Sequence, residues 1–584
     1  MIAARPKGLP GLPWGQPAGP GIGTVRRLPR DAFQRRSGRA TASSRPVPPE
    51  GGTLVNFRFS VWLALALCAT AAPALGASDA RAPENACQDL YRLTDVDHAV
   101  EPGVVMPATD DVPAHCRVRG VIDGTIGFQV TMPVEGWRER LMFHAVGGTA
   151  GVLGDTGSLL SKGFAMATTD TGHKSVTTQG SEFARDDNAL INFGFRAIHL
   201  TTVLAKRLVA AFYGREVRYS YITGCSNGGR AALVEALRYP EDFDGVIAGA
   251  PASGWGREIV PWGVAAHRKQ RANPLDEASL ALLDANSKQA CDALDGLADG
   301  IVGNPTQCTL DVLNLEGLEC TGGETSGCLT VGQIDTARFL YTGVVDDEGQ
   351  VLSPGVLPGA EAAGEWQIWV TGNPAFLALP GHEGMGGIVR DLFHRKPGFD
   401  LEQFDPVTDR VELAEASVSV ELPEPDFGAF RAGGGKLLIY QGWQDVPCRA
   451  LELLNYVSRA EALSGGREGM AEFSRIYMVP GMLHCVAGPG AWAADYIQPM
   501  VDWVEQGRPP ERLVAHQPGI VDWLDAFGAV ASGQVDWYPR AMEAGAGHAD
   551  ARRFSRPLCP FPERARYTGS GDPDDAASFT CVAD

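Results

Sequence analysis

The 584-residue sequence is short of positive charge. It contains 50 Lys and Arg against 70 Asp and Glu, which gives a formal net charge of −20. A nucleic-acid partner requires a basic face, so this deficit argues against nucleic-acid binding. Long apolar runs are also scarce, because the run over residues 61–75 is interrupted by Pro73 and is too short to span a bilayer comfortably. We therefore expect no nucleic-acid partner and no stable membrane anchor.

The N-terminal region differs in composition from the rest of the chain. Residues 1–54 are rich in Pro, Gly and Arg and lack apolar periodicity, a pattern typical of disorder. Residues 55–76 combine a short basic region, an apolar core and small residues, which predicts a secretory signal cleaved after Gly76 or Ala77. Since such signals seldom begin so far along a chain, we expect translation to start near Val55. The mature protein is predicted to be secreted or periplasmic.

Cysteine usage agrees with export. The chain has twelve cysteines, and eleven remain when Cys68 of the predicted signal is removed. Eight of them form close pairs, which in an exported protein suggest disulfides, although spacing does not fix the connectivity. Cys448 has no obvious partner and is expected to be the free thiol. The close pairs are Cys87 with Cys116, Cys291 with Cys308, Cys320 with Cys328, and Cys559 with Cys581.

Strand-like and helix-like segments alternate over residues 89–252. The predicted strands are 141–146, 164–169, 217–223 and 246–251, and the predicted helices are 195–213 and 230–239. This alternation predicts a parallel sheet covered on both faces. It stops over residues 256–430, which hold four cysteines and many glycines and are interpreted as an inserted domain. It resumes with a strand at 436–440, a helix at 449–463 and a strand at 475–479, so the core is predicted to comprise residues 77–255 and 431–584.

The segment Gly224-Cys225-Ser226-Asn227-Gly228 matches the nucleophile elbow G-x-S-x-G. In a glycine-rich chain the bare pattern arises by chance, and a simple glycine turn is an equally good interpretation of the five residues alone. The predicted strand before the segment and the predicted helix after it favour an elbow. Ser226 is therefore the candidate nucleophile.

A serine nucleophile needs a base, and the base needs an orienting acid. In α/β-hydrolases the chain order is Ser, acid, His. Asp445 follows the predicted strand 436–440 and His484 follows the predicted strand 475–479, so both fit that order. Cys225 precedes the candidate nucleophile and Cys485 follows the candidate base. A disulfide between them would bring Ser226 and His484 within hydrogen-bond reach.

These motifs resemble those of the tannase and feruloyl esterase family, whose relatives include mono(2-hydroxyethyl) terephthalate hydrolases. The resemblance runs from about Cys87 to Cys581 and is weakest in the inserted region. It implies an α/β-hydrolase core with a mostly parallel, doubly wound sheet, a large inserted lid domain, and a Cys225–Cys485 disulfide. The segments that carry it are residues 167–173 (ATTDTGH), 192–199 (NFGFRAIH), 224–230 (GCSNGGR), 238–245 (RYPEDFDG), 480–485 (PGMLHC) and 556–560 (RPLCP).

A second motif lies in the predicted lid. Residues 291–301 space three carboxylates closely around glycines, and this spacing alone is more typical of an acidic turn than of a metal site. The resemblance implies a structural Ca²⁺ here, braced by Cys291–Cys308, because hard oxygen donors suit calcium. The implied ligands are the side chains of Asp292, Asp295 and Asp299 with the carbonyls of Leu297 and Ile301.

The oxyanion hole of such an enzyme needs two N–H donors. One is predicted from Asn227, the residue after the nucleophile. The other is expected in the loop that follows the predicted strand 141–146, at Gly148, with Gly147 as the alternative.

The resemblance implies a serine esterase that acts on esters of aromatic acids, such as feruloyl, galloyl or terephthalate esters, through an acyl-enzyme. No organic cofactor is expected. Two alternatives remain: an esterase for aliphatic or polyester substrates, and a non-catalytic, calcium-dependent binding protein. Trp255, Trp366 and Phe393 are candidates for contacting the aromatic acid, but each fits equally well in the core of the lid. The oligomeric state is not indicated.

Overall fold

The structure is a computed structural model that describes residues 82–175, 180–323, 326–372, 390–392, 403–530, 534–548 and 551–583. Residues 78–584 form one compact unit. The predicted extension (1–54), the predicted signal (55–76) and Phe393 lie outside the described residues. Among the described residues, no helix combines the length and the apolar character that crossing a bilayer requires.

A ten-stranded sheet forms the centre of this unit. Six neighbouring strands are parallel to one another, and most of their residues are buried. The sheet is therefore mostly parallel, as predicted. In spatial order the six are β6 (Phe164–Thr169), β5 (Arg140–His144), β7 (Tyr219–Cys225), β8 (Gly245–Gly249), β11 (Lys436–Gly442) and β12 (Ser474–Val479).

An antiparallel extension continues the sheet beyond β6, and the sequence analysis missed it. β3 and β4 form a hairpin that closes through Asp123 and Gly124, both at positive φ (51° and 71°). This Asp-Gly pair is a recognisable hairpin signal. β4 then pairs antiparallel with β6. The strands are β1 (His98–Val100), β2 (Val104–Met106), β3 (His115–Ile122) and β4 (Ile126–Pro133).

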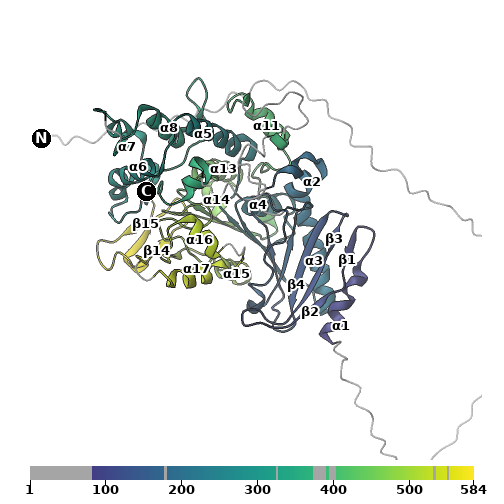
Figure 1. The fold of residues 1–584 in the computed structure, drawn as a ribbon. Helices are drawn as coiled ribbons and strands as arrows, with labels where there is room; N and C mark the ends of the chain where they lie inside the picture. The colour runs from purple at the N-terminus through teal and green to yellow at the C-terminus, as the bar shows by residue number, and fades with distance from the viewer. Residues whose placement is uncertain are drawn as a thin grey trace, which may run out of the picture. The chain divides into compact units, whose positions relative to one another are not determined.

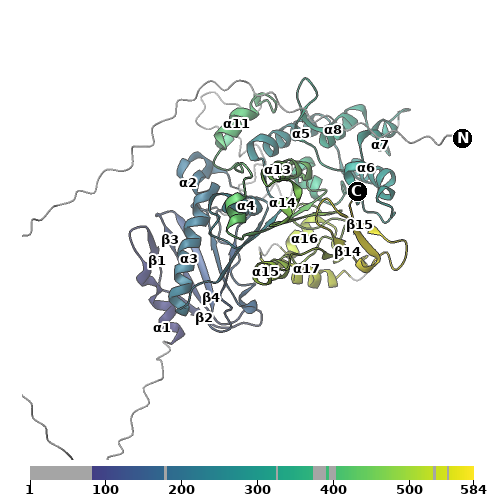
Figure 2. The same cartoon turned by 180° about the vertical axis from the view of Figure 1, so that it is seen from behind.

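Helices cover both faces of the sheet (Figures 1 and 2). Successive residues of a strand point to opposite faces, so Leu141 and Phe143 of β5 belong to one hydrophobic cluster and Met142 to another. The first cluster contains residues of α3 (Ala197–Tyr213), α4 (Asn227–Arg238) and α13 (Ala450–Leu463). The second contains residues of α15 (Ile497–Gln506), α16 (Trp523–Val530) and α17 (Trp537–Ala546). The core is an α/β-hydrolase-like, doubly wound fold.

The segment between β8 and β11 is mainly helical and has a hydrophobic core of its own around Trp262, Leu280 and Trp366. Figures 1 and 2 show its helices α5, α6, α7 and α8 side by side. The boundaries 256–430 for an inserted domain stay a prediction, because this segment and the sheet belong to one compact unit. Its elements are α5 (Val260–Ala272), α6 (Glu277–Cys291), α7 (Leu310–Leu313), α8 (Val331–Thr342), β9 (Gly343–Val345), β10 (Val351–Pro354), α11 (Arg410–Ala416) and α12 (Gly428–Ala432).

Short elements and disulfides complete the unit. The remaining elements are α1 (Pro83–Gln88), α2 (Asp187–Ile191), α14 (Arg467–Ala471), and the strand pairs β13 (Leu513–Gln517) with β14 (Phe554–Leu558) and β15 (Arg564–Tyr567) with β16 (Phe579–Val582). All four close cysteine pairs are disulfides, and Cys225–Cys485 is the fifth. Cys448 is the free cysteine of the described part of the chain.

Candidate active site

Ser226 lies in the turn between β7 and α4. Its backbone is at φ 64° and ψ −126°, a region that residues other than glycine rarely adopt. The turn requires its glycines, because a Cβ at Gly224 or Gly228 would lie 2.5 Å or 2.2 Å from the Ala145 carbonyl oxygen. Close contact with the end of β5 therefore holds the strained turn, which presents Ser226 at the carboxyl end of the parallel strands.

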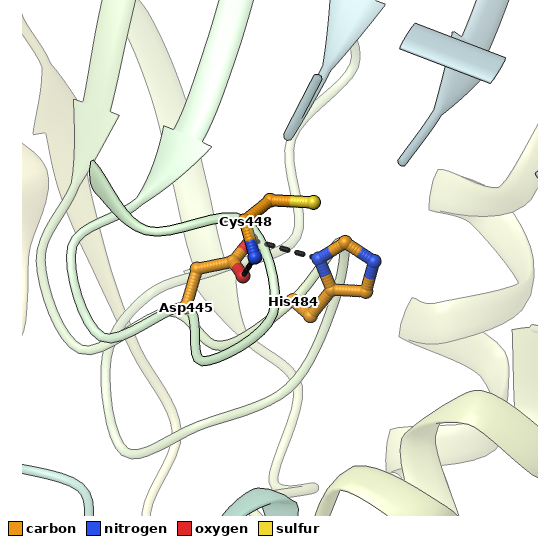
Figure 3. A group of neighbouring side chains, drawn as sticks. All are labelled: Asp445, Cys448 and His484. Atoms are coloured by element: carbon orange, nitrogen blue, oxygen red, sulfur yellow. Dashed lines mark hydrogen bonds and ion pairs between the residues drawn. The ribbon is translucent and has the colours of Figure 1, made fainter. Parts of the chain in front are cut away.

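Asp445 and His484 follow the two neighbouring strands β11 and β12 and meet at the same edge of the sheet (Figure 3). Asp445 is fully buried and His484 is 5% exposed. The Asp445 carboxylate accepts three hydrogen bonds: from His484 Nδ1 at 2.8 Å, Gln441 Nε2 at 3.0 Å and the Cys448 N–H at 2.8 Å. A buried carboxylate held in this way fixes the imidazole so that Nε2 points away from Asp445.

The Cys225–Cys485 disulfide connects the elbow to the histidine loop. It spans 260 residues of sequence and brings the two Cα atoms to 6.0 Å, with Ser226 and His484 as the adjoining residues. Among the described residues, no hydrogen bond joins the Ser226 hydroxyl to the His484 ring. Bonds of this kind often become short only when substrate is bound. The covalent link therefore sets the separation of the two loops.

Three contacts that the sequence analysis missed also hold the histidine loop. Trp523 Nε1 donates to the His484 carbonyl oxygen at 2.9 Å, and the His484 N–H donates to Glu365 Oε2 at 3.2 Å. The Trp369 ring stands edge-on to the imidazole with centroids 6.3 Å apart. Glu365 and Trp369 belong to the inserted segment, so that segment lies directly against the candidate base. No motif marks these residues, and only their position in space reveals them.

The predicted oxyanion donors flank Ser226. Asn227 is the first residue of α4, and its side-chain oxygen accepts a hydrogen bond from Arg230 Nε at 2.7 Å. On the other side, a Cβ at Gly147 would lie 3.8 Å from Ser226 Cβ, and Gly148 follows at φ 58°. Among the described residues, no protein acceptor takes a hydrogen bond from the N–H groups of Asn227, Gly147 or Gly148. The choice between the two glycines stays a prediction.

Arg230 explains why two of the sequence motifs come together. It is fully buried and donates to the carbonyl oxygens of Gly194 at 2.9 Å and Phe193 at 3.2 Å, in addition to Asn227. One guanidinium thus connects residues 192–199 to the helix behind the elbow. The π-helical turn Asn192–Arg196 presents both carbonyl groups to it.

The predicted aromatic contacts have different surroundings. Trp366 is 2% exposed and packs against Tyr341 in the core of the inserted segment. Trp255 is 8% exposed and lies beside Phe193, in a hydrophobic cluster that also contains Cys448. Burial among apolar and anionic groups raises the pKa of the Cys448 thiol, so this free cysteine is uncharged at neutral pH.

Four of the five predicted calcium ligands line one cavity, whereas Asp292 is not part of its lining and accepts hydrogen bonds from the N–H groups of Asp299 and Gly300. Asp295, Leu297, Asp299 and Ile301 line a cavity of about 300 Å³, and Arg556 forms an ion pair with Asp299 at 2.6 Å. Burial, with a smaller contribution from the neighbouring carboxylates, raises the pKa of Asp295 to about 6. A cation would relieve this unfavourable charge, and carboxylates with backbone carbonyls are the donors that Ca²⁺ takes. The residues present therefore fit the ion.

Comparison with known proteins identifies the family. The family model described as tannase and feruloyl esterase matches residues 111–582. The chain belongs to the tannase and feruloyl esterase family. Among its relatives in this family, an uncharacterised esterase of Xanthomonas campestris pv. campestris is 31% identical over 558 residues, covering 85% of this chain and 91% of the relative. Mono(2-hydroxyethyl) terephthalate hydrolase of Piscinibacter sakaiensis is 30% identical over 548 residues, covering 81% and 85%.

A solved structure supports the same fold. The crystal structure of an esterase from Aspergillus oryzae superimposes with a TM-score of 0.71 at 23% identity, covering 85% of this chain and all of the other. Membership of the tannase and feruloyl esterase family makes the chain a carboxylic ester hydrolase. The alternative of a non-catalytic binding protein is therefore wrong.

Proposed function

We propose that Ser226, His484 and Asp445 are the catalytic triad of an esterase that forms an acyl-enzyme. The observation that carries the proposal is the Cys225–Cys485 disulfide, which joins the strained elbow to the loop whose imidazole is hydrogen-bonded to Asp445. Three segments that are distant in the sequence thereby meet at one edge of the sheet. A structural role alone gives no reason for a serine at φ 64° beside a carboxylate-bound histidine.

The mechanism follows from the position of each group. His484 accepts the Ser226 proton while Asp445 holds the imidazole and stabilises the imidazolium that forms. Ser226 Oγ attacks the ester carbonyl carbon, and the N–H groups of Asn227 and Gly148 stabilise the developing oxyanion. His484 then protonates the departing alcohol. Water, activated by the same imidazole, hydrolyses the acyl-enzyme and restores Ser226.

Esters of aromatic acids are the proposed substrates. Support comes from the family description, which includes feruloyl esterase, and from the relative that is a mono(2-hydroxyethyl) terephthalate hydrolase. The aromatic side chains of Trp255 and Trp369, on the segment that lies against His484, suit a planar acyl group. An esterase for aliphatic or polyester substrates is the second candidate.

A substrate panel distinguishes these two candidates. Initial rates are measured with methyl ferulate, methyl gallate, mono(2-hydroxyethyl) terephthalate and p-nitrophenyl butyrate. We expect kcat/KM for the preferred aromatic-acid ester to exceed that for the butyrate at least about tenfold, because even one methylene gained or lost in an apolar pocket is worth about 1–3 kcal/mol. A preference for the butyrate over all three aromatic acids would favour the aliphatic candidate.

A structural calcium ion is proposed at residues 291–301, held by Asp292, Asp295 and Asp299 and by the carbonyl oxygens of Leu297 and Ile301. Its role is to neutralise the buried carboxylates, and it takes no part in ester chemistry. The Cys291–Cys308 disulfide closes the same segment. In the described part of the chain, the three carboxylates do not all lie within 4.8 Å of one another. Calcium binding would have to draw them closer together.

Chelation should lower the thermal stability. A ligand at 100 times its Kd stabilises the folded state by about 2.7 kcal/mol, so EDTA should lower Tm by about 3 °C in a unit of this size. Added Ca²⁺ should restore Tm. Asp295→Asn is the matched control, because its Tm should already be low and should respond to neither reagent. An unchanged Tm after dialysis against EDTA would contradict the calcium site.

Secretion is proposed as well. The five disulfides of the described residues are typical of proteins that fold in an oxidising compartment. They support export to the periplasm or the medium, and the predicted signal at residues 55–76 would direct it. Mass analysis of the N-terminus of the exported protein tests the cleavage after Gly76 or Ala77.

A further inference from the structure

Glu365 of the inserted segment bridges the two loops that carry the proposed acid and base. Its side chain is fully buried. Oε2 accepts the His484 N–H at 3.2 Å, and the backbone N–H of Val446, the residue after Asp445, lies near enough to the carboxyl group to act on it electrostatically. One side chain from the insert thus contacts the backbone of both loops.

The surroundings of this carboxyl group disfavour a negative charge. Burial and the nearby Asp445 carboxylate raise the pKa of Glu365 well above its ordinary value. The titratable groups that face it are Asp445, His484 and the Cys448 thiol. Oε1 is buried and has no hydrogen-bond partner among the described residues, so it is the oxygen that can carry a proton without losing a contact. A second carboxylate beside Asp445 would repel it.

We propose that Glu365 is a positioning residue of the active site, an uncharged hydrogen-bond acceptor through which the inserted segment fixes the His484 loop against the Asp445 loop. The inference rests on the proposed triad. It gives the inserted segment a second role in addition to covering the substrate. The orientation of the imidazole would depend on a side chain outside the hydrolase core.

The test compares two substitutions at this position. Glu365→Gln keeps an acceptor oxygen and carries no charge, so kcat should stay within about threefold of the wild type. Glu365→Ala leaves the His484 N–H without its acceptor. Displacement of a catalytic group by about 1 Å costs on the order of 100-fold in rate, so kcat should fall between tenfold and 100-fold while KM changes less than threefold. A merely structural role would lower Tm without this split between kcat and KM.

The pH profile gives a second, independent measurement. An uncharged Glu365 predicts that kcat/KM of the wild type and of Glu365→Gln rises with the same apparent pKa. An ionised Glu365 would raise the pKa of the triad imidazole, and its replacement by Gln would shift the profile down by about one pH unit. The pH profile needs only Glu365→Gln, so it tests the proposal even if Glu365→Ala fails to fold.

Glu361 is the matched control. It is a fully buried carboxyl group of the same segment, and it is hydrogen-bonded to Ser287 and Tyr341 instead of the triad loops. Glu361→Ala should lower Tm as Glu365→Ala does, with kcat within threefold of the wild type in the folded protein. The proposal would be overturned by an unchanged kcat in Glu365→Ala. It would also be overturned if Glu365→Gln were as slow as Glu365→Ala, or if the pH profile of Glu365→Gln were shifted from that of the wild type. Labelling of the wild-type protein with a fluorophosphonate separates failure of the Glu365 proposal from failure of the proposed triad. If the triad is wrong, the wild-type protein does not react.

Discussion

Replacing Ser226 by Ala should lower kcat by about 10⁵- to 10⁶-fold, since loss of the nucleophile in comparable triads abolishes nearly all catalysis. Ester hydrolysis by the purified protein is the measurement, with labelling by a fluorophosphonate as a second readout. The variant should fold, because the Ser226 hydroxyl group makes no hydrogen bond among the described residues. At the positive φ of the elbow, Ala is only slightly less favourable than Ser. Substrate affinity should change far less than kcat.

Ser220→Ala is the matched control for this experiment. Ser220 lies at the start of the same strand, where its hydroxyl group donates to the carbonyl oxygen of Asp242. Its loss should lower Tm and leave kcat within threefold of the wild type. If Ser226→Ala kept more than a tenth of the wild-type rate, or if labelling persisted, the nucleophile would be a different residue.

The second large effect is expected when the Cys225–Cys485 bond is removed in the double variant Cys225→Ala, Cys485→Ala. All three residues of the proposed triad are intact in this protein, yet kcat should fall at least about 100-fold, because the bond sets the separation of Ser226 from His484 and small displacements are costly. Stability should fall too, by about 3 to 5 kcal/mol for so long a loop. Mild reduction of the wild-type enzyme should have the same effect on kcat.

Removal of the Cys87–Cys116 bond separates the two effects. This disulfide closes a 29-residue loop at the antiparallel end of the sheet, so its loss should lower the stability, though less than loss of the longer loop, and leave kcat within threefold at a temperature where the protein stays folded. A Cys225, Cys485 double variant with full activity would show that packing alone holds the elbow and the histidine loop together.

The parallel part of the fold was predictable because its strands are continuous apolar runs. The prediction for residues 164–169 coincides with β6, and residues 436–440 lie within β11. The antiparallel strand β3 was missed because polar residues alternate with apolar ones in it, and its buried positions are every second residue, whereas every residue of β4 is buried. The alternation in β3 is a strand signal of period two. No helix separates β3 from β4, so the pair does not fit the strand–helix alternation by which the parallel strands were predicted.

The geometry of the candidate site was predictable where a motif fixes a local conformation. Three features of the candidate site can be read directly from the sequence. They are the glycines of the elbow, the order Ser, acid, His along the chain, and the two cysteines beside Ser226 and His484. Glu365, Trp369 and Trp523 were not predictable, since each acts on His484 from a segment without a motif, and only tertiary packing brings them there. The glycine of the oxyanion hole stays undecided for the same reason: Gly147 and Gly148 are equivalent in sequence.

The 260-residue span of the Cys225–Cys485 bond also orders events during biosynthesis. Cys225 emerges from the ribosome long before its partner. Its thiol therefore stays unpaired with Cys485 while the whole inserted segment, with its own four cysteines, is synthesised. A newly made chain in a reducing cytoplasm keeps the two halves of the site unlinked. If the chain is exported as proposed, oxidation would be the last step of its maturation. The enzyme would then become active only in the compartment where the bond can form.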